Sequence, residues 1–276
     1  MIPVLEHRRI LLGVTGSIAA YKAADLASRL TQAGAQVDVL LTESAQRFVS
    51  ALTFQSVTGR RAYTGADLWG TEAHVLHVGL AHGADLLVIA PATADTLAKL
   101  AQGRADTLLT LTALAVTCPL LLAPAMDAGM YGHPATQANL EILRARGAAI
   151  IGPAEGRMAS GLVGPGRMVE PAELLGHIRL ALGRSGPLAG RRVVVTAGGT
   201  QEPLDPVRAL TNHSSGKQGY ALAQAALDRG AQVTLISAPT ALAAPVGAQV
   251  IPVGTAAQMG EALLPATALA DVLLMA

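Results

Sequence analysis

A polar stretch of the chain, residues 193–223, combines the residue types that bind anions. It runs from an apolar strand through Gly198, Gly199 and Thr200 to a long loop, and then to Ser-Ser-Gly-Lys (214–217) at the start of a helix. Backbone N–H groups at a glycine turn and a helix N-terminus can bind anionic oxygens, and a lysine adds a positive charge. Because long loops inside compact domains are usually functional, we predict a binding site here, with a plain surface loop as the alternative. The polar side chains of the loop include Asp205, Arg208, Asn212 and His213.

The first half of the chain places small and polar residues after three predicted strands. Gly16 and Ser17 follow the strand at 10–14, the turn PATADT (91–96) follows the strand at 85–90, and PAMD (124–127) follows the strand near 120. Ligands of open α/β sheets bind beyond the carboxyl ends of the strands, so these turns predict a second site. Neither half contains G-x-G-x-x-G, so a monophosphate fits better than a nicotinamide dinucleotide. The alternatives are helix capping by Ser17 or by Asp95.

Histidines and arginines supply further candidates. His74, His77 and His82 lie in one segment without cysteine or carboxylate at ligand spacing, so we predict no metal site there. One imidazole could act as a general base, and each could equally be a surface or capping residue. The glycine-rich segment 155–171 is typical of a mobile flap, in which Arg157 and Arg167 could bind an anion, or of a simple connector. No G-x-S-x-G motif supports Ser-His-Asp hydrolysis.

The composition excludes several classes of protein. The 276 residues carry a formal charge of +1 and 3% aromatic side chains, so nothing supports nucleic-acid binding. Cys118 is the only cysteine, which excludes a disulfide within the chain and favours a reducing, cytoplasmic location. The N-terminus does not resemble a signal peptide. The longest apolar tract, 107–126, contains Pro119 and Pro124 and predicts a helix, a break and a buried strand rather than a membrane span.

The elements that must position these residues alternate between strands and helices. Apolar runs, short glycine turns and helical patterns predict βαβ crossovers and parallel sheets, and the 51% hydrophobic content suits buried strands. In the first helix, apolar residues from Ile18 to Leu30 recur at helical spacing. The predicted strands are 10–14, 37–41, 85–90, 119–123, 149–151, 193–196, 233–237, 249–253 and 271–275. Further helices are predicted at 96–101, 134–146, 173–182, through 222–227 and from 255.

These patterns predict an α/β protein with two domains. The first, of about six strands, covers residues 1–183, and the second covers 191–276. The linker, 184–190, is rich in Gly, Pro and Ser. The chain ends inside the apolar strand 271–275 without a polar tail, so we expect the second domain to be incomplete.

Taken in order, these motifs resemble the family of bifunctional coenzyme A biosynthesis proteins, in which phosphopantothenoylcysteine decarboxylase is fused to phosphopantothenate–cysteine ligase. Residues 8–182 resemble the FMN-dependent cysteine decarboxylases through GVTGSIAAYKA, HVGLAHGADLLVIAPATADTLAK, PAMDAGMY and GPGRMVEP. Residues 191–276 resemble the start of the ligase domain through VTAGGTQEPLDPVRALTNHSSGKQGYALA. The resemblance implies a Rossmann-like flavoprotein domain with a parallel sheet, followed by a second, incomplete Rossmann-like α/β domain.

The resemblance implies a site for FMN and a role for several residues. Decarboxylation of 4′-phosphopantothenoyl-L-cysteine to 4′-phosphopantetheine is the expected reaction of the first domain, with His77 at the position of the catalytic histidine. Asp127 stands where many members have an Asn that holds the substrate carboxylate, and an ionised Asp repels that group unless it is protonated or faces a donor. Ser160 stands where many have a proton-donating cysteine, and a hydroxyl is a far weaker acid. The expected FMN contacts are Gly16, Ser17, Ser44, Thr93, Ala94 and Asp95, and the expected substrate contacts are Met126 and Arg167.

For the second domain the resemblance implies a ligase that uses CTP and Mg²⁺. Asn212 would contact the acyl-cytidylate, and Ser214, Ser215 and Lys217 would lie near its anionic groups. Flavin domains of the family assemble as trimers or larger shells, so we expect a homo-oligomer acting on small molecules, without nucleic acid or membrane. Two alternatives remain open: a flavin prenyltransferase, and a non-catalytic flavin- or nucleotide-binding protein.

Overall fold

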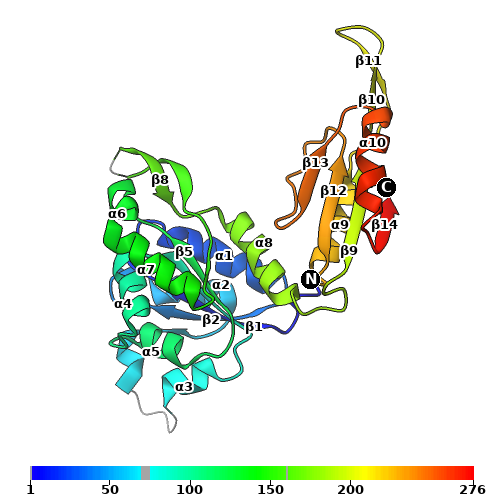
Figure 1. The fold of residues 1–276 in the computed structure, drawn as a ribbon. Coiled ribbons are helices and arrows are strands. Elements are labelled where there is room, and N and C mark those ends of the chain that lie inside the picture. The colour runs from blue at the N-terminus through cyan, green and yellow to red at the C-terminus, as the bar shows by residue number, and fades with distance from the viewer. Residues whose placement is uncertain (1, 70–74, 160) are drawn as a thin grey trace. The chain divides into compact units, whose positions relative to one another are not determined.

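The computed structural model describes residues 2–69, 75–159 and 161–276 (Figure 1). The chain divides into two compact units, Met1–Leu175 and Gly176–Ala276, and the division falls within α8 (Pro171–Gly183). Each unit contains its own parallel sheet with helices packed on it. The predicted α/β class is therefore confirmed.

A six-stranded parallel sheet forms the centre of the first unit, in the order β3-β2-β1-β4-β5-β6. β1 lies between β2 and β4, because Ile10 pairs with Val37 on one side and with Leu86 on the other. Nearly every residue of β1 and β4 is buried, which explains why these strands are continuous apolar runs. The strands are β1 (Arg9–Val14), β2 (Gln36–Leu41), β3 (Ala62–Tyr63), β4 (Leu86–Ala92), β5 (Leu120–Pro124) and β6 (Ala149–Ile150).

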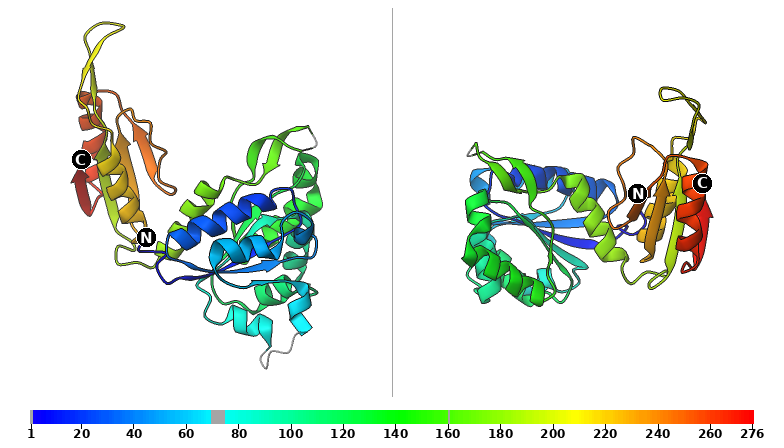
Figure 2. Two further views of the ribbon diagram at one scale, coloured as in Figure 1. Left: turned by 180° about the vertical axis from the view of Figure 1, so that it is seen from behind. Right: turned by 45° about the horizontal axis from the view of Figure 1, so that its top comes forward.

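Helices cover both faces of this sheet (Figure 2). α1 buries Leu26 and Leu30 on the face that its apolar residues share. On the other face, Leu97, Leu109 and Leu140 from three helices pack with strand residues in one core cluster. The helices are α1 (Ala20–Gln32), α2 (Ala51–Thr58), α3 (Leu76–Ala81), α4 (Ala94–Gln102), α5 (Leu108–Ala115), α6 (Ala128–Gly132) and α7 (Pro134–Ala145), with 3₁₀ turns η1 (Ala45–Arg47) and η2 (Gly65–Trp69).

The structure confirms the predicted strands of this unit to within two residues, and the tract 107–126 forms α5, a break and β5 as predicted. The prediction for Ile18 was wrong. α1 begins only at Ala20, so Ile18 lies in the preceding turn and its side chain is exposed. The short β3, α2 and α3 were not predicted, because two to eight residues carry too little periodicity to identify.

The second unit contains a four-stranded parallel sheet in the order β13-β12-β9-β14. Val193 in β9 pairs with Val233 on one side and with Val272 on the other. α9 packs Ala223 and Leu227 into the core of this sheet. The elements are β9 (Arg192–Ala197), α9 (Lys217–Leu227), β12 (Gln232–Ser237), β13 (Gln249–Pro252), α10 (Ala256–Thr267) and β14 (Val272–Met275).

The long polar loop predicted after β9 contains an antiparallel hairpin, β10 (Gln201–Pro203) with β11 (Ala209–Thr211). The base of the hairpin is attached to the start of α10, where Gln201 N donates to Gly254 O at 2.8 Å and Ala256 N donates to Glu202 Oε1 at 2.9 Å. Strands of three residues have no alternating pattern that a sequence could reveal, so the prediction of an unstructured loop was wrong in this part.

The last turns of α8 belong to the second unit, where Arg179 pairs with Asp228 through two hydrogen bonds. Both side chains are largely buried, so each neutralises the other. None of the helices within the described ranges has the length and apolar character that a membrane crossing requires.

Candidate active site

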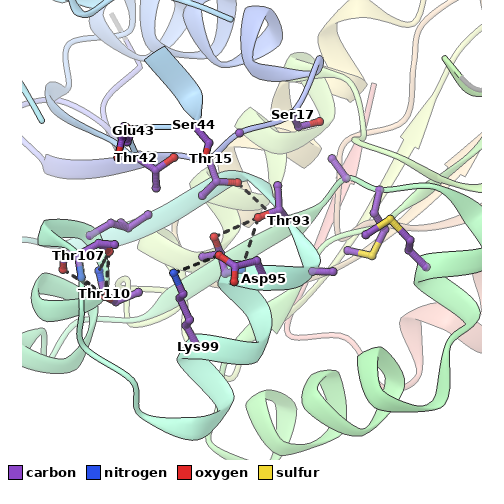
Figure 3. Close-up of a pocket in the computed structure, with 17 residues that line it drawn as sticks. Thr15, Ser17, Thr42, Glu43, Ser44, Thr93, Asp95, Lys99, Thr107 and Thr110 are labelled. Carbon is purple, nitrogen blue, oxygen red and sulfur yellow. Dashed lines mark hydrogen bonds and ion pairs between the residues drawn. The ribbon is translucent and has the colours of Figure 1, made fainter. Parts of the chain in front are cut away.

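A pocket of about 570 Å³ opens in the first unit beyond the carboxyl ends of β1, β2, β4 and β5 (Figure 3). This is the edge at which open α/β sheets bind ligands. All six residues predicted to contact FMN line it, although they come from three separate turns of the chain. The lining residues are Thr15, Gly16, Ser17, Thr42, Glu43, Ser44, Thr93, Ala94, Asp95, Thr96, Lys99, Thr107, Leu109, Thr110, Ala125, Met126 and Met130.

The turns after β1 and β4 are joined by one threonine hydroxyl. The buried Thr15 donates from Oγ1 to Pro91 O at 2.7 Å and accepts from Thr93 N at 3.1 Å. On the other side, Gly16 approaches Ser44 so closely that an added Cβ would overlap the Ser44 side chain. Glycine at this position therefore lets the turns after β1 and β2 meet beside the pocket.

Neither capping alternative explains Ser17 or Asp95. The N-cap of α4 is Thr93, whose hydroxyl accepts from Thr96 N. Asp95 therefore lies within the first turn of α4 and does not cap the helix. The N-cap position of α1 is Ala19, and Ser17 lies two residues earlier, where its Oγ accepts from Ala19 N at 3.2 Å. Both side chains line the pocket as the binding hypothesis requires.

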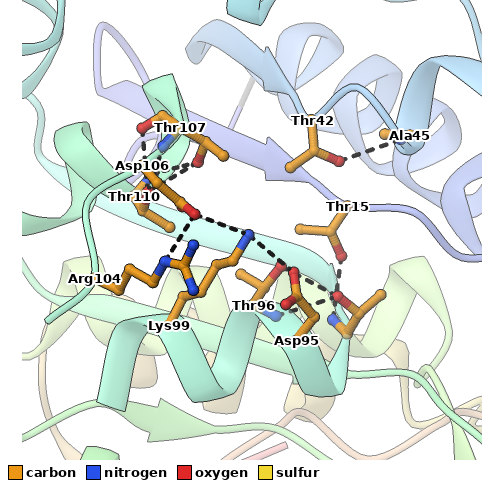
Figure 4. A network of polar contacts seen from close by, with 11 residues as sticks. Thr15, Thr42, Ala45, Asp95, Thr96, Lys99, Arg104, Asp106, Thr107 and Thr110 are labelled. Carbon is orange, nitrogen blue, oxygen red and sulfur yellow. Dashed lines mark hydrogen bonds and ion pairs between the residues drawn. The ribbon is translucent and has the colours of Figure 1, made fainter. Parts of the chain in front are cut away.

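Lys99 and Asp95 of this pocket form a connected network with two charged residues beside it (Figure 4). The Lys99 ammonium lies 3.2 Å from Asp95 Oδ2 and 3.5 Å from Asp106 Oδ2, and Arg104 pairs with Asp106 at 2.9 Å. Sequence analysis missed Lys99 and Glu43. The spacing Asp95-x-x-x-Lys99 on a predicted helix was the available signal for the first, because residues four apart share a helix face.

Threonines that sequence analysis also missed line the end of the pocket nearest α5. Thr107 caps α5 and forms a reciprocal capping box with Thr110. Thr42 follows β2 and accepts from Ala45 N through Oγ1 at 3.2 Å. No motif marks these positions, because each becomes a lining residue only when the sheet brings the strand ends together.

A second pocket, of about 530 Å³, lies next to the first and shares Ser17, Ala125 and Met126 with it. It contains the three remaining residues predicted for the substrate side, Met126, Asp127 and Arg167. The two pockets therefore provide adjoining spaces, one lined by hydroxyls and small residues and one flanked by cations.

The second pocket is closed on one side by the hairpin of β7 (Ala154–Arg157) and β8 (Val163–Arg167), where a flap or a connector was predicted. Met126 N donates to Gly166 O at 3.0 Å, which attaches the hairpin to the turn after β5. An added Cβ on Gly166 would overlap Met126 O and lie 2.8 Å from the Met158 sulfur. Close packing at Gly166 thus holds the hairpin beside the pocket.

Three cations and a carboxylate surround the second pocket. Lys22 is buried and donates to Glu170 Oε1 at 2.7 Å and to Met168 O at 3.2 Å. Arg167 lies 3.5 Å from the same Glu170, whereas Arg157 has no ion pair with any residue that the structure describes. Asp127 is the N-cap of α6, and its Oδ1 accepts from Gly129 N at 2.9 Å. The carboxylate therefore faces a donor, one of the two arrangements that reduce repulsion of a bound carboxylate.

One predicted catalytic residue, His77, is not brought into these pockets. His77 lies on α3, its Nδ1 is buried without a hydrogen-bond partner among the described residues, and it lines neither pocket. Ser160, like His74, lies outside the described residues. The pockets of the first unit thus contain the predicted binding residues but not the predicted histidine.

In the second unit the predicted ligand residues do come together. Asn212 Oδ1 accepts from Ser214 N at 2.8 Å, and an added Cβ on Gly199 would lie 2.5 Å from this oxygen. Gly216, with a φ of +74°, caps α9, which begins at Lys217. These groups surround the glycine turn after β9, the type of backbone that binds anionic oxygens.

Asp205 organises the turn between β10 and β11. Hydrogen bonds from Val207 N at 2.9 Å, from Arg208 Nε and from Arg208 N lower the pKa of its carboxyl below the usual value. The carboxylate is therefore a structural acceptor for the hairpin. Across the described ranges, no group of three His, Cys, Asp or Glu side chains is placed to hold a metal ion.

Comparison with known families follows the division of the chain. Residues 4–182 match the Flavoprotein family, and residues 188–276 match the DNA/pantothenate metabolism flavoprotein C-terminal domain. A coenzyme A biosynthesis bifunctional protein CoaBC of Bacillus subtilis (strain 168) is 48% identical over 274 residues, covering 98% of this chain and 68% of that protein. The CoaBC protein of Mycobacterium tuberculosis (strain ATCC 25618 / H37Rv) is 48% identical and covers 99% and 67%. The chain thus spans about two thirds of the length of these relatives.

Solved structures agree with this assignment. A PPC decarboxylase mutant complexed with pantothenoylaminoethenethiol has a TM-score of 0.58 and 36% identity, covering 63% of this chain and 98% of that one. The FMN-binding protein AtHal3 has a TM-score of 0.57 and 36% identity, covering 63% and 96%. These matches confirm the Rossmann-like flavoprotein fold of the first unit. By its two matching domains, its near full-length identity to curated relatives and its fold, the chain belongs to the family of coenzyme A biosynthesis bifunctional proteins.

Proposed function

We propose that the first unit is an FMN-dependent decarboxylase of 4′-phosphopantothenoyl-L-cysteine, yielding 4′-phosphopantetheine. The observation that carries this proposal is the meeting of the two pockets at Ser17, Ala125 and Met126. A flavin in the first pocket would be next to a substrate in the second. The relatives are named as coenzyme A biosynthesis proteins, and a structural neighbour is named as a PPC decarboxylase.

The first pocket fits FMN by its shape and its donors. Gly16 has no side chain, which lets it approach Ser44 closely, and Ser17 and Ser44 add hydroxyl groups to the lining of the pocket. Gly16, Ser17 and Ser44 would hold the phosphate of FMN, and the turn at Thr93 and Asp95, together with Ala94, would contact the rest of the cofactor. When bound, FMN supplies the two-electron redox chemistry, and the protein supplies orientation and proton transfer.

The chain's own residues then bind and orient the substrate in the second pocket. Arg167 and its neighbouring cations would attract the anionic groups of the substrate, with Met126 beside the flavin pocket. Asp127, bonded to Gly129 N, would take the position near the substrate carboxylate. Ser160 would occupy the position of the proton donor, and His77 would serve as the base that takes a proton from the substrate.

The position of His77 outside both pockets favours assembly with further copies of the chain. A homo-oligomer, trimeric in its flavin domains or larger, would let His77 of one subunit serve the pockets of another. Exposed apolar side chains of the first unit, among them Ile18, Tyr21, Phe48 and Leu52, support such an interface. Mixing a His77→Asn subunit with a Gly16→Ala subunit tests the idea, because activity returns only if the two residues act across subunits.

We further infer that the second unit belongs to a ligase that uses CTP and Mg²⁺ to join cysteine to 4′-phosphopantothenate in the longer proteins of the family. Asn212 would contact the activated acyl group, and Ser214, Ser215 and Lys217 would lie near its phosphate. The proposed domains are 1–183 and 191–276, joined by 184–190. A cytoplasmic location remains part of the proposal, and cell fractionation tests it.

Purified protein tests the decarboxylase proposal in two steps. We expect a yellow protein with a flavin absorption band and, on mixing with phosphopantothenoylcysteine, release of CO₂ in a single turnover. A protein that takes up no FMN contradicts the proposal. FMN binding without CO₂ release favours the non-catalytic flavin-binding alternative, and prenylation of reduced FMN by an added prenyl phosphate, with phosphate as the leaving group, favours a flavin prenyltransferase.

A further inference from the structure

The first pocket poses an electrostatic problem for the cofactor proposed to occupy it. Two carboxylates line the pocket, Glu43 and Asp95, and Lys99 is the single cation among its described lining residues. A phosphate monoester adds nearly two negative charges. Without Lys99, the phosphate of a flavin would enter a pocket that is already doubly negative.

The position of Lys99 lets its ammonium neutralise part of this negative charge. Its side chain is 21% exposed, and its ammonium lies 3.2 Å from Asp95 Oδ2, whereas the Asp95 side chain is 73% exposed at the pocket. The two residues are four apart on α4, with the acidic residue nearer the N-terminus, which is the favourable order for such a pair. The carboxylate that faces the ligand space is thus paired from below by a partly buried ammonium (Figure 3).

Arg104 pairs with the other carboxylate near Lys99, so that Lys99 can pair with Asp95. Lys99 also lies 3.5 Å from Asp106, but Arg104 already pairs with Asp106 at the shorter distance of 2.9 Å. Asp106 therefore has its own counter-ion at the surface (Figure 4). The positive charge of Lys99 remains available to offset Asp95.

We propose that Lys99 is a positioning residue that neutralises and orients Asp95, so that the pocket accepts a flavin carrying a phosphate dianion. Lys99 thereby selects FMN over riboflavin, its neutral analogue without phosphate. The inference rests on the proposed function, because it takes FMN as the occupant of this pocket. It assigns the selectivity to an ion pair beside the ligand rather than to a direct contact of Lys99 with the phosphate.

Flavin fluorescence titrations of the full chain test the inference with FMN and with riboflavin. Lys99→Gln should weaken FMN binding about tenfold and change riboflavin binding less than twofold, since only the phosphorylated ligand is repelled by the uncovered carboxylate. Lys99→Arg, which keeps the charge, should bind FMN within about threefold of the wild-type Kd. Arg144→Gln is the matched control: it removes a surface cation that pairs with Glu141 and lines neither pocket, and it should leave both affinities unchanged.

A second comparison does not depend on the single Lys99→Gln variant. Asp95→Asn and the double variant Asp95→Asn/Lys99→Gln should differ in FMN affinity by a much smaller factor than the wild type and Lys99→Gln do, because the ammonium then offsets only Glu43 in the lining. Thermal unfolding of the apoproteins shows which variants fold. These variants also distinguish neutralisation of Asp95 from a direct contact between Lys99 and the phosphate. If Lys99 contacted the phosphate directly, the double variant would still bind FMN weakly.

The outcomes test the role of Lys99 separately from the proposed binding of FMN. Equal weakening of FMN and riboflavin by Lys99→Gln, unchanged FMN affinity in that variant, or a loss from Lys99→Gln that is as large in the Asp95→Asn background as in the wild type would each overturn the role of Lys99 and leave FMN binding intact. Failure of the wild-type protein to bind FMN would overturn both the proposed function and this inference.

Discussion

At the scale of single residues, His77 offers the sharpest test of the proposed chemistry. Its Nδ1 is buried and has no hydrogen-bond partner among the described residues. In His77→Asn we expect FMN to remain bound, because His77 lines neither pocket, while bleaching of the flavin by substrate slows at least about 100-fold. Stopped-flow absorbance measures that rate.

The matched control for this variant is His82→Asn, which changes an exposed imidazole at the end of the same helix. The printed hydrogen bonds of His82 are made by its backbone, whose N donates to Val78 O and whose O accepts from Arg9 Nη1, and the substitution preserves both. We expect His82→Asn to bleach at the wild-type rate. Bleaching of His77→Asn at that same rate would contradict the assignment of the base.

Gly16 provides a prediction about the shape of the cofactor pocket. In Gly16→Ala the new methyl group would overlap Ser44, so the turns after β1 and β2 must separate. We expect FMN affinity to fall at least about tenfold and the free energy of unfolding to fall by about 1–3 kcal/mol, as for other overpacked sites. FMN titration and urea denaturation measure the two effects.

Gly79→Ala serves as the comparison for Gly16→Ala. Gly79 lies within α3, and an added Cβ meets no atom within 4 Å. Alanine there should leave FMN affinity unchanged and slightly stabilise the helix. Equal behaviour of the two variants would argue against the close approach of Gly16 and Ser44 as a determinant of the site.

The sequence predicted residues that line the first pocket far better than the charges that surround them. Gly16, Ser17 and Asp95 follow strands whose apolar runs are unmistakable, so the edge where they meet could be predicted. Lys99 and Thr110 lie on helices that bring them to the pocket only through packing in three dimensions. The position of His77 depends on tertiary structure, and no periodicity in its segment contains that information.

At the scale of elements, the hairpin of β10 and β11 should depend on pH through Asp205. The pKa of this carboxyl is lowered in the folded hairpin by the bonds from Val207 N and Arg208. A lowered folded pKa means that the contribution is fully present above the ordinary value, near about 4, and is lost as pH falls through the folded pKa. We therefore expect the protection factors of the Val207 and Arg208 amides, which are exchange rates corrected for their intrinsic pH dependence, to fall in strongly acidic solution and to stay constant between pH 5 and 8.

Asp205→Asn is the variant that checks the cause. An amide oxygen can still accept from Val207 N, but it cannot titrate or pair with the Arg208 guanidinium. Exchange at these amides, followed by NMR, should then be independent of pH between 2 and 5 after correction for intrinsic rates. A persisting pH step in the variant would point to another titrating group.

The elements also show why the two hairpins were harder to predict than the sheets. Parallel strands such as β4 are buried on both faces and read as unbroken apolar runs. β8, in contrast, contains Gly164, Pro165 and Gly166, residues typical of turns. β8 is extended because it pairs with β7 and accepts a hydrogen bond from Met126 N, and not because its residues favour a strand.

At the scale of the whole molecule, flavin binding should reside in the first unit alone. Both pockets are lined only by residues up to Met168, and each unit has its own sheet and core. We expect the fragment 1–183 to bind FMN within about threefold of the affinity of the whole chain. Fluorescence titration of the two proteins makes the comparison, and loss of binding in a folded fragment would show that the second unit takes part in the site.

Two pairs of threonines beside the first pocket have hydroxyl hydrogens that are shared within each pair. Thr93 and Thr96 share one hydrogen bond at 3.1 Å in which either hydroxyl could be the donor, and Thr107 and Thr110 share another at 2.9 Å. The hydroxyls of Thr93 and Thr96 have two hydrogens and use one between them, so the other can turn toward whatever enters. In the second pair, Thr110 Oγ1 can also donate to Thr107 O at 3.2 Å. Rotation of a hydroxyl therefore lets the pocket offer a hydrogen-bond donor to a ligand oxygen in place of a water oxygen. The polypeptide backbone does not need to move.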